Sequence, residues 1–164
     1  MVESAQNPLQ HFPCFCMTAT PRPAQLDKIV KRFARIQEPK RRYEQLLWLA
    51  KKLEPFPAQS KQPENKVPGC VSQVYITASL EDGKVHYQGD SDAQITKGLL
   101  AMLITAVGGL SPQEIVQLTP DFIQETQLDV SLTPSRANGF YNIFKMMQKK
   151  ALLLLDGAEE APEA

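Results

Sequence analysis

The residue best suited to covalent chemistry is Cys70, which follows a Pro-Gly pair and precedes a stretch of alternating character. Pro68 fixes one backbone dihedral angle and Gly69 permits any, so the pair predicts a tight bend that presents Cys70 at the mouth of a strand. Loops held by rigid neighbours often carry reactive groups, and a thiolate is a nucleophile. A free cysteine is more commonly a small buried hydrophobe, so this stretch alone leaves both interpretations open.

Other residues with catalytic or metal-binding potential are few. His86 lies on a predicted strand, where it is either an exposed strand residue or a base for Cys70. Asp90 and Asp92 flank a predicted helix start, where the helix dipole and capping favour carboxylates, whereas a metal site there would need further ligands. The sequence lacks a glycine-rich phosphate loop, hydrolase motifs and paired cysteines of zinc spacing in the predicted domain. We therefore expect no metal site and no cofactor.

Composition narrows the classes of protein that fit. The chain has 164 residues, 43% hydrophobic and 22% charged, with a formal net charge of zero. These values are typical of a soluble globular domain; they favour neither a nucleic-acid partner nor a membrane, since no apolar run approaches the roughly 18 residues of a span. Basic residues gather between 28 and 52 at a spacing typical of a solvated helix face. Three cysteines, two of them near the N-terminus, indicate a reducing compartment, so we expect a cytoplasmic protein.

The two ends of the chain are predicted to lie outside the domain. Residues 1–23 have little periodicity and no long apolar run, which predicts a disordered extension. Glu3 and the absence of arginine before Arg22 are atypical of a transit peptide; a targeting role for this segment would instead place the protein in an organelle stroma. The acidic residues 156–164 predict a disordered tail, so the domain is expected to span 24–155.

The N-terminal segment holds the other two cysteines. Cys14 and Cys16 form a C-x-C pair that could bind a metal or close a local disulfide, although no second pair accompanies them. Met17 is an alternative start that would remove both cysteines.

Periodicity predicts the elements that position Cys70. Apolar residues at helical spacing predict helices over 24–37 and 39–53, with Trp48 packing in the core or at its edge. A Pro-rich loop then leads to Cys70. Alternation predicts a strand over 71–80, and an Asp-Gly turn returns the chain into a second strand over 85–88.

Helices dominate the rest of the chain. Ser91 and Gln94 have capping-box spacing ahead of a helix that is apolar almost all round, which predicts a central place in the core. Ser111 begins a second capping box and a short helix, and one or two helical turns are expected within 120–127. A long helix follows residues 133–139, with its apolar stripe inward.

Four stretches of this sequence together resemble the SufE family of cysteine desulfuration proteins, in order and at similar spacing. They are residues 67–75, 89–93, 97–99 and 132–139. The resemblance covers about residues 24–153. Val71 stands where the family usually carries a polar residue and Tyr75 where it usually carries Trp, and neither departure removes the thiol. The resemblance implies an α+β fold like that of SufE and IscU, with a small antiparallel sheet of about three strands packed against helices. The third strand is expected near residues 66–71.

The resemblance also implies a sulfur acceptor. Family members take sulfane sulfur from the persulfide of a SufS-like, pyridoxal-phosphate-dependent cysteine desulfurase onto their own cysteine, here Cys70. They pass it toward an iron-sulfur scaffold complex, and they activate the desulfurase rather than act as independent enzymes. One thiolate suffices for this transfer. The family shelters its cysteine in the free protein and swings the loop out on docking.

Further residues in the matching stretches are expected to support the loop or bind the partner. They are Gly69, Ser72, Gln73, Asp90, Asp92 and Arg136. Arg136 would pair with a partner carboxylate or steady the loop, while the alternative is local hydrogen bonding in the first turn of a helix. Two other functions stay open. A cluster scaffold would need about three ligands where Cys70 supplies one, and a desulfurase-binding adaptor would not use Cys70 at all.

Overall fold

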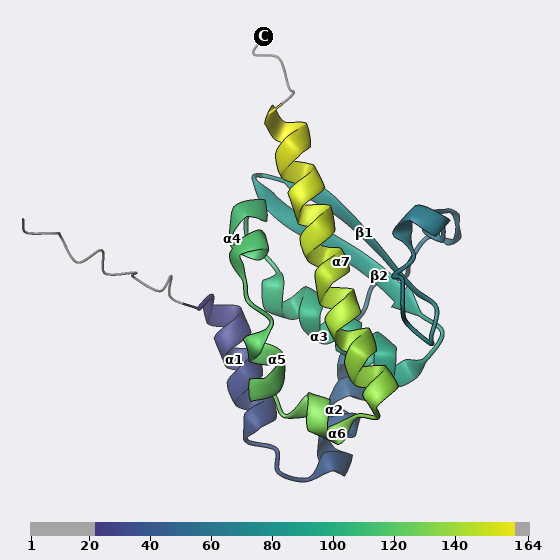
Figure 1. Ribbon diagram of the computed structural model, residues 1–164, viewed down its shortest axis with the longest axis vertical. Helices are drawn as coiled ribbons and strands as arrows, with labels where there is room; N and C mark the ends of the chain where they lie inside the picture. Colours follow the sequence, from purple (N-terminus) through teal and green to yellow (C-terminus); the bar gives the residue numbers. More distant parts are fainter. Residues whose placement is uncertain (1–21, 160–164) are drawn as a thin grey trace, which may run out of the picture.

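The computed structural model describes residues 22–159, in which seven α-helices accompany one β-hairpin (Figure 1). The elements are α1 (Ala24–Ala34), α2 (Pro39–Ala50), β1 (Val74–Glu81), β2 (Lys84–Ser91), α3 (Gln94–Val107), α4 (Pro112–Gln117), α5 (Asp121–Glu125), α6 (Leu128–Ser131) and α7 (Pro134–Glu159). Two short 3-10 turns, Ala58–Ser60 and Pro63–Asn65, lie in the loop that leads to Cys70. The predicted α+β class is confirmed. Of the segments predicted to be disordered, 1–23 and 156–164, residues 1–21 and 160–164 lie outside the described residues.

The hairpin forms because its turn and its alternation agree. Asp82 and Gly83 both adopt positive φ angles, 51° and 74°, as a tight turn between twisted strands requires. Val74 and Ile76 on β1 are buried, as are Val85 and Tyr87 on β2, so one face of the hairpin packs on helices. Helices α7 and α3 contact β1 and β2 respectively, and Figure 1 shows α7 lying along the hairpin.

The expected third strand is reduced to a single bridge. Within residues 22–159 the sheet has two strands, and Lys66 pairs with Tyr75 as an isolated antiparallel bridge. The Val67 amide donates to the Val74 carbonyl at 2.8 Å, after which the pairing stops. Pro68 has no amide hydrogen and Gly69 has φ of 74°, so the chain turns away from β1 instead of extending the ladder.

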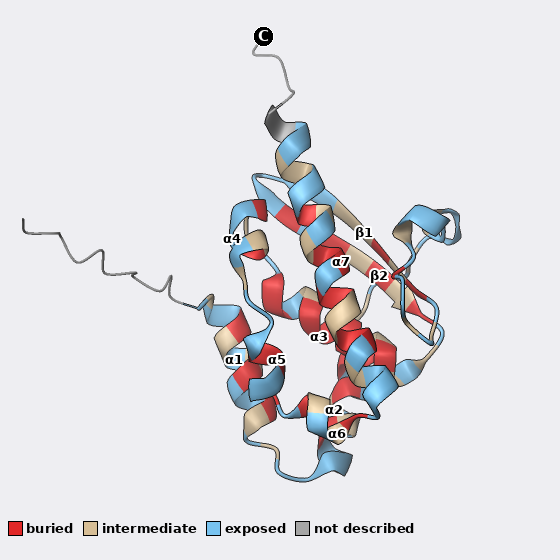
Figure 2. Cartoon of the chain, viewed as in Figure 1, coloured by how far each residue is buried: buried red, intermediate tan, exposed pale blue. Residues whose placement is uncertain are grey.

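Helix α3 forms the centre of the core. It contacts α1, α2, β2 and α7, and most of its residues are buried (Figure 2). The inward stripe of α7 is confirmed, with five predicted residues buried: Phe140, Ile143, Phe144, Met147 and Ala151. Trp48 lies at the edge, with 43% of its surface exposed. Helix α7 continues past the predicted boundary at Leu155 to Glu159, so residues 156–159 of the tail predicted to be disordered are helical.

Of the two helix capping boxes predicted from sequence, one is present and one is not. The box at Ser111 is confirmed, since its hydroxyl accepts from the Glu114 amide and Glu114 accepts from the Ser111 amide at 2.8 Å. The box predicted at Ser91 is wrong. Ser91 pairs with Val74 as the last residue of β2, and α3 begins one residue after an Ala93 N-cap with no side-chain cap bond.

One member of the basic segment is not on a solvated face. Arg42 is 4% exposed, and its guanidinium donates to the Ile36 carbonyl at 2.7 Å and to the Ser131 hydroxyl at 2.6 Å. It also donates to the side chain and the carbonyl of Gln127, at 2.7 and 3.3 Å. This buried guanidinium therefore joins α2 to α6, a short helix that the sequence did not predict.

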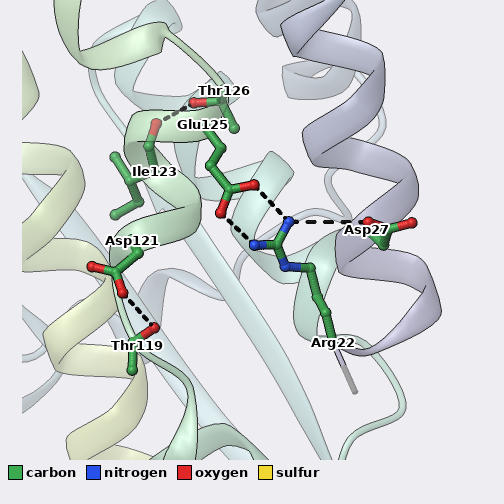
Figure 3. A network of polar contacts seen from close by, with 7 residues as sticks. All are labelled: Arg22, Asp27, Thr119, Asp121, Ile123, Glu125 and Thr126. Atoms are coloured by element: carbon green, nitrogen blue, oxygen red, sulfur yellow. Dashed lines mark hydrogen bonds and ion pairs between the residues drawn. The ribbon is translucent and has the colours of Figure 1, made fainter. Parts of the chain in front are cut away.

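An exposed polar network fastens the start of the described chain to α5 (Figure 3). The Arg22 guanidinium makes two hydrogen bonds to the Glu125 carboxylate, one of them at 2.8 Å, and lies 4.0 Å from Asp27 on α1. The hydrogen bond from Arg22 lowers the pKa of Glu125. Surface pairs of this kind contribute little stability, so the network fixes the orientation of the chain more than it stabilises the fold. No helix within residues 22–159 has the length and apolar character that a membrane span needs.

Replacing Gly98 with alanine should destabilise the domain. A Cβ atom there would lie 2.5 Å from the Leu46 carbonyl oxygen and 2.7 Å from its carbonyl carbon, because α3 and α2 approach each other at this glycine. We expect Gly98→Ala to lower the free energy of unfolding by about 2 kcal/mol, measured by urea denaturation. The control is Gly157→Ala, since a Cβ there meets nothing within 4 Å. Equal stability of the two variants would contradict this account of the α2–α3 contact.

Candidate functional site

Cys70 lies half-buried between its own loop and the second turn of α7. Its Sγ donates a weak hydrogen bond to the Gly139 carbonyl oxygen at 3.7 Å, and a Cβ on Gly139 would lie 3.6 Å from the sulfur. Burial raises the pKa of the Cys70 thiol above its ordinary value, because the thiolate is disfavoured where water is excluded. The thiol is therefore held neutral and sheltered in the free protein.

Two side chains of α7 hold the loop on the N-terminal side of Cys70. The Asn142 amide nitrogen donates to the Gly69 carbonyl oxygen at 3.2 Å, and the Lys150 ammonium donates to the Asn65 side chain at 2.9 Å. Burial lowers the pKa of Lys150. The backbone conformation favours glycine at position 69, where φ is 74°. A Cβ there would also lie 2.8 Å from the Asn142 nitrogen and would displace that amide.

Hydrogen bonds to α3 and to Asp92, the residue directly after β2, hold the C-terminal side of the same loop. The Ser72 and Thr96 hydroxyls lie 3.3 Å apart. The Gln73 amide donates to the Asp92 carboxylate at 2.9 Å, and the Asp92 amide donates to the Gln73 carbonyl at 3.2 Å. Between these anchors Val71 is 86% exposed. Residues 65–73, which we call the Cys70 loop, are thus tied at both ends and free at the tip.

Asp90 connects the preceding loop to β2 and α3. Its two carboxylate oxygens pair with Lys61 at 2.9 Å and with Lys97 at 3.0 Å. Partial burial alone would raise the pKa of Asp90, but hydrogen bonds from the two lysines outweigh it, so its pKa lies below the usual range. Asp92 thus contacts the Cys70 loop itself, and Asp90 contacts the loop before it. Neither caps α3, because Asp90 still belongs to β2 and the Asp92 carboxylate accepts from Gln73.

Arg136 and His86 stand apart from the thiol. Arg136 is exposed in the first turn of α7, and among residues 22–159 its guanidinium makes no hydrogen bond or ion pair. It therefore does not steady the Cys70 loop in the free protein. His86 is exposed and pairs with Ser79, toward the turn of the hairpin, whereas the Cys70 loop is attached at its open end. His86 is thus not placed to act as a base for Cys70.

The site has one thiol and no metal-binding cluster in the described part of the chain. No three His, Cys, Asp or Glu side chains come together within residues 22–159. Cys14 and Cys16, the predicted C-x-C pair, lie outside that range. A thiol without a neighbouring base or metal can accept an atom from a reactive donor and release it to another thiol.

Three side chains that tether the Cys70 loop from other elements were not predicted from the sequence: Thr96, Asn142 and Lys150. Lys61, which holds the loop before it to Asp90, was not predicted either. One sequence feature could have indicated those on α7: Gly139, Asn142 and Lys150 are non-apolar residues at helical spacing, so they form a stripe on one face of the helix. Such a stripe is also typical of a solvated face, so it became informative only once the loop was known to lie across α7.

Comparison with known proteins shows the family. Residues 27–151 match the family described as "SufE: Fe-S metabolism associated domain". An uncharacterized SufE-like protein of Synechocystis sp. is 67% identical over 141 residues, which cover 86% of this chain and 89% of that protein. The chain therefore belongs to the SufE family, and its role is in iron-sulfur metabolism.

Two plant relatives contain a similar domain within longer chains. The "SufE-like protein 1, chloroplastic/mitochondrial" of Arabidopsis thaliana is 49% identical over 84% of this chain, which covers 38% of that protein. The "Quinolinate synthase, chloroplastic" of Nicotiana tabacum is 33% identical over 87% of this chain, which covers 20% of that protein. A solution structure of a hypothetical protein from Thermus thermophilus has a TM-score of 0.71, at 24% identity, over 82% of this chain and 98% of that chain. That likeness shows the fold alone.

Removing the Asn142 amide should expose the thiol more often. A hydrogen bond of this kind contributes about 1 kcal/mol, so Asn142→Ala is expected to raise the rate of Cys70 alkylation by iodoacetamide about fivefold at fixed pH. The background is a Cys14→Ser, Cys16→Ser double variant, in which only Cys70 reacts. The control is Asn138→Ala, one turn earlier, where the exposed side chain makes no hydrogen bond within residues 22–159. Equal rates for both variants would rule out this tether.

The raised pKa of Cys70 also predicts a pH dependence. In the same double variant, the midpoint of the pH–alkylation profile should lie higher for the folded protein than in urea, because burial disfavours the thiolate. The thiol therefore contributes stability below the unfolded pKa, and this contribution is lost as pH rises through the folded pKa. Urea denaturation at several alkaline pH values measures that loss against Cys70→Ser, which should not show it. Coincident alkylation midpoints would contradict the sheltered thiol.

Proposed function

We propose that this protein accepts sulfur from the persulfide of a pyridoxal-phosphate-dependent, SufS-like cysteine desulfurase onto Cys70 and delivers it to an iron-sulfur scaffold complex. The observation that carries this proposal is the sheltered thiol of Cys70 in a loop tied at both ends and free at the tip. Such a loop lowers the reactivity of a nucleophile in the free protein without burying it permanently.

The proposed transfer needs only the one thiol. The Cys70 thiolate attacks the outer sulfur of the donor persulfide, and the sulfur–sulfur bond of the donor breaks. The donor cysteine leaves as a thiolate, and Cys70 becomes a persulfide. Electrons balance within the exchange, so no external oxidant is required. In this reaction the protein is a co-substrate and activator of the desulfurase rather than an independent enzyme.

Docking must open the shelter for this reaction to occur. We propose that the desulfurase contacts Val71, which is 86% exposed at the tip, and that the loop then leaves Gly139 and Asn142. The guanidinium of Arg136 is exposed at the same end of α7, and it would pair with a carboxylate of the desulfurase. Gly69, Ser72, Gln73, Asp90 and Asp92 would set the loop's resting position and its ability to move.

A reducing compartment suits this function, because Cys70 must be a free thiol between turnovers. We therefore propose a cytoplasmic location, or an organelle stroma if residues 1–23 direct the protein there. The scaffold alternative is disfavoured, since within residues 22–159 Cys70 has no neighbouring group of metal ligands.

Mapping the transferred sulfur tests the proposal. Incubation with a SufS-like desulfurase and labelled cysteine should add the mass of one sulfur atom to the peptide that contains Cys70, and a reductant should remove it. Cys70→Ser should abolish both this adduct and the stimulation of alanine release, while binding to the desulfurase persists. The Cys14→Ser, Cys16→Ser double variant is the control and should retain both. If Cys70→Ser still stimulates the desulfurase, the protein is an adaptor and the carrier proposal fails.

A further inference from the structure

A second surface stands out on the helices that do not hold the Cys70 loop. A groove between α1 and α2 is lined by six residues: Arg32, Ile36, Arg41, Glu44, Gln45 and Trp48. Trp48 is 43% exposed there, a large fraction for a tryptophan, which is highly buried on average. We call these six residues, together with Lys52, the α1–α2 groove.

Two cations lie close to the exposed indole. The Lys52 ammonium is 3.8 Å from the centroid of the Trp48 ring, and the Arg32 guanidinium carbon is 5.4 Å from it. Within residues 22–159, neither Arg32 nor Lys52 forms an ion pair with a carboxylate. Exposed cation–π contacts contribute about 0.5–1 kcal/mol, which leaves both cations available to a stronger anionic partner.

One residue that lines the same groove, Gln45, has a buried side-chain donor without a partner within residues 22–159. The side-chain nitrogen of Gln45 is inaccessible to solvent and has no hydrogen bond to the rest of the described chain. An unsatisfied buried donor of this kind costs about 1–3 kcal/mol. A turn of the Gln45 amide toward an oxygen atom in the groove would remove that cost.

The charge of this region contrasts with that of the whole chain. Residues 24–54 contain nine Lys and Arg but four Asp and Glu, whereas the complete sequence has 18 of each. Arg42 is buried and Arg41 pairs with Glu38, but the excess of positive charge remains on the surface. Glu44 is the one carboxylate among the residues lining the groove. The region therefore complements a negatively charged partner.

We propose that the α1–α2 groove binds an acidic segment of a partner protein. A carboxylate of that segment would pair with Arg32 and Lys52 and accept from Gln45, while its methylene groups pack on Trp48. A nucleic acid fits less well, since the groove has one aromatic ring rather than a row of stacking platforms and the chain has no net positive charge. No groove residue tethers the Cys70 loop, so this surface and the thiol are able to engage different proteins.

Trp48 reports on binding directly, because it is the single tryptophan of the sequence. The probe is a short polyglutamate peptide at low salt, with length-matched polylysine and polyglutamine peptides and a single-stranded RNA oligonucleotide as comparisons. We expect a saturable change in Trp48 fluorescence with polyglutamate alone, and weaker binding as salt rises. Binding to each variant is then measured by anisotropy of a labelled polyglutamate peptide.

Charge reversal separates specific binding from general attraction. Arg32→Glu with Lys52→Glu should weaken polyglutamate binding at least about tenfold. The control Lys84→Glu with Lys145→Glu makes the same change in net charge at exposed positions outside the groove and should leave affinity within about twofold. Gln45→Leu should raise the free energy of unfolding yet weaken binding, a combination that a structural role would not produce.

Several outcomes would overturn the proposal. Equal losses in the groove and control variants would show general attraction between opposite charges. Tighter binding of the RNA oligonucleotide would assign the surface to nucleic acid instead. Unaltered polyglutamate affinity in Gln45→Leu would show that the buried donor takes no part in binding. The proposed sulfur transfer is tested separately, because every groove variant should still form a persulfide on Cys70 at saturating desulfurase.

Discussion

The candidate site depends on how one half-buried thiol is held against a helix. Cys70 touches the Gly139 carbonyl of α7, while the chain on either side of it is fixed by separate elements. Asn142 of α7 holds the N-terminal side of the Cys70 loop, and Asp92, directly after β2, holds its C-terminal side. Each neutral hydrogen bond contributes about 0.5–1.5 kcal/mol, against about 5–15 kcal/mol for a whole domain. The loop is therefore able to open while the fold stays intact.

The hairpin and the two longest helices supply the rigidity that this arrangement needs. One face of the hairpin is buried by α3 and α7, and the Cys70 loop is attached at its open end, where Gln73 pairs with Asp92. Gly98 lets α2 approach the backbone of α3, so the element that carries Thr96 and Lys97 is fixed from both sides. The Cys70 loop is therefore attached to packed elements, the hairpin and α3. The basic α1–α2 groove is a separate surface, because its lining residues come from helices that do not hold the loop.

Much of this fold follows from local pattern. The period-two alternation and the Asp-Gly turn determined the hairpin, because a turn with two positive φ angles suits few other residue pairs. The strand predicted over 71–80 begins only at Val74, and residues 71–73 lie in the Cys70 loop. Apolar stripes determined α1, α2, α3 and α7, since a helix must bury its apolar face. Where long-range strand pairing competed with a local capping signal, the prediction from sequence was wrong. Ser91 carries a capping-box pattern, yet its pairing with Val74 keeps it in β2.

By itself, the sequence singled out the residue to which we assign the proposed sulfur transfer, because Cys70 alone combines a reactive side chain with a Pro-Gly turn and a following strand. Only the tertiary structure decided that this thiol is sheltered and that Arg136 stays exposed. It also decided that Asp92 holds the Cys70 loop and Asp90 the loop before it, rather than capping α3. Asn142 and Lys150 act on residues more than seventy positions earlier in the chain. No periodicity or short motif records such pairs, because contacts this distant in sequence exist only after the helices have packed.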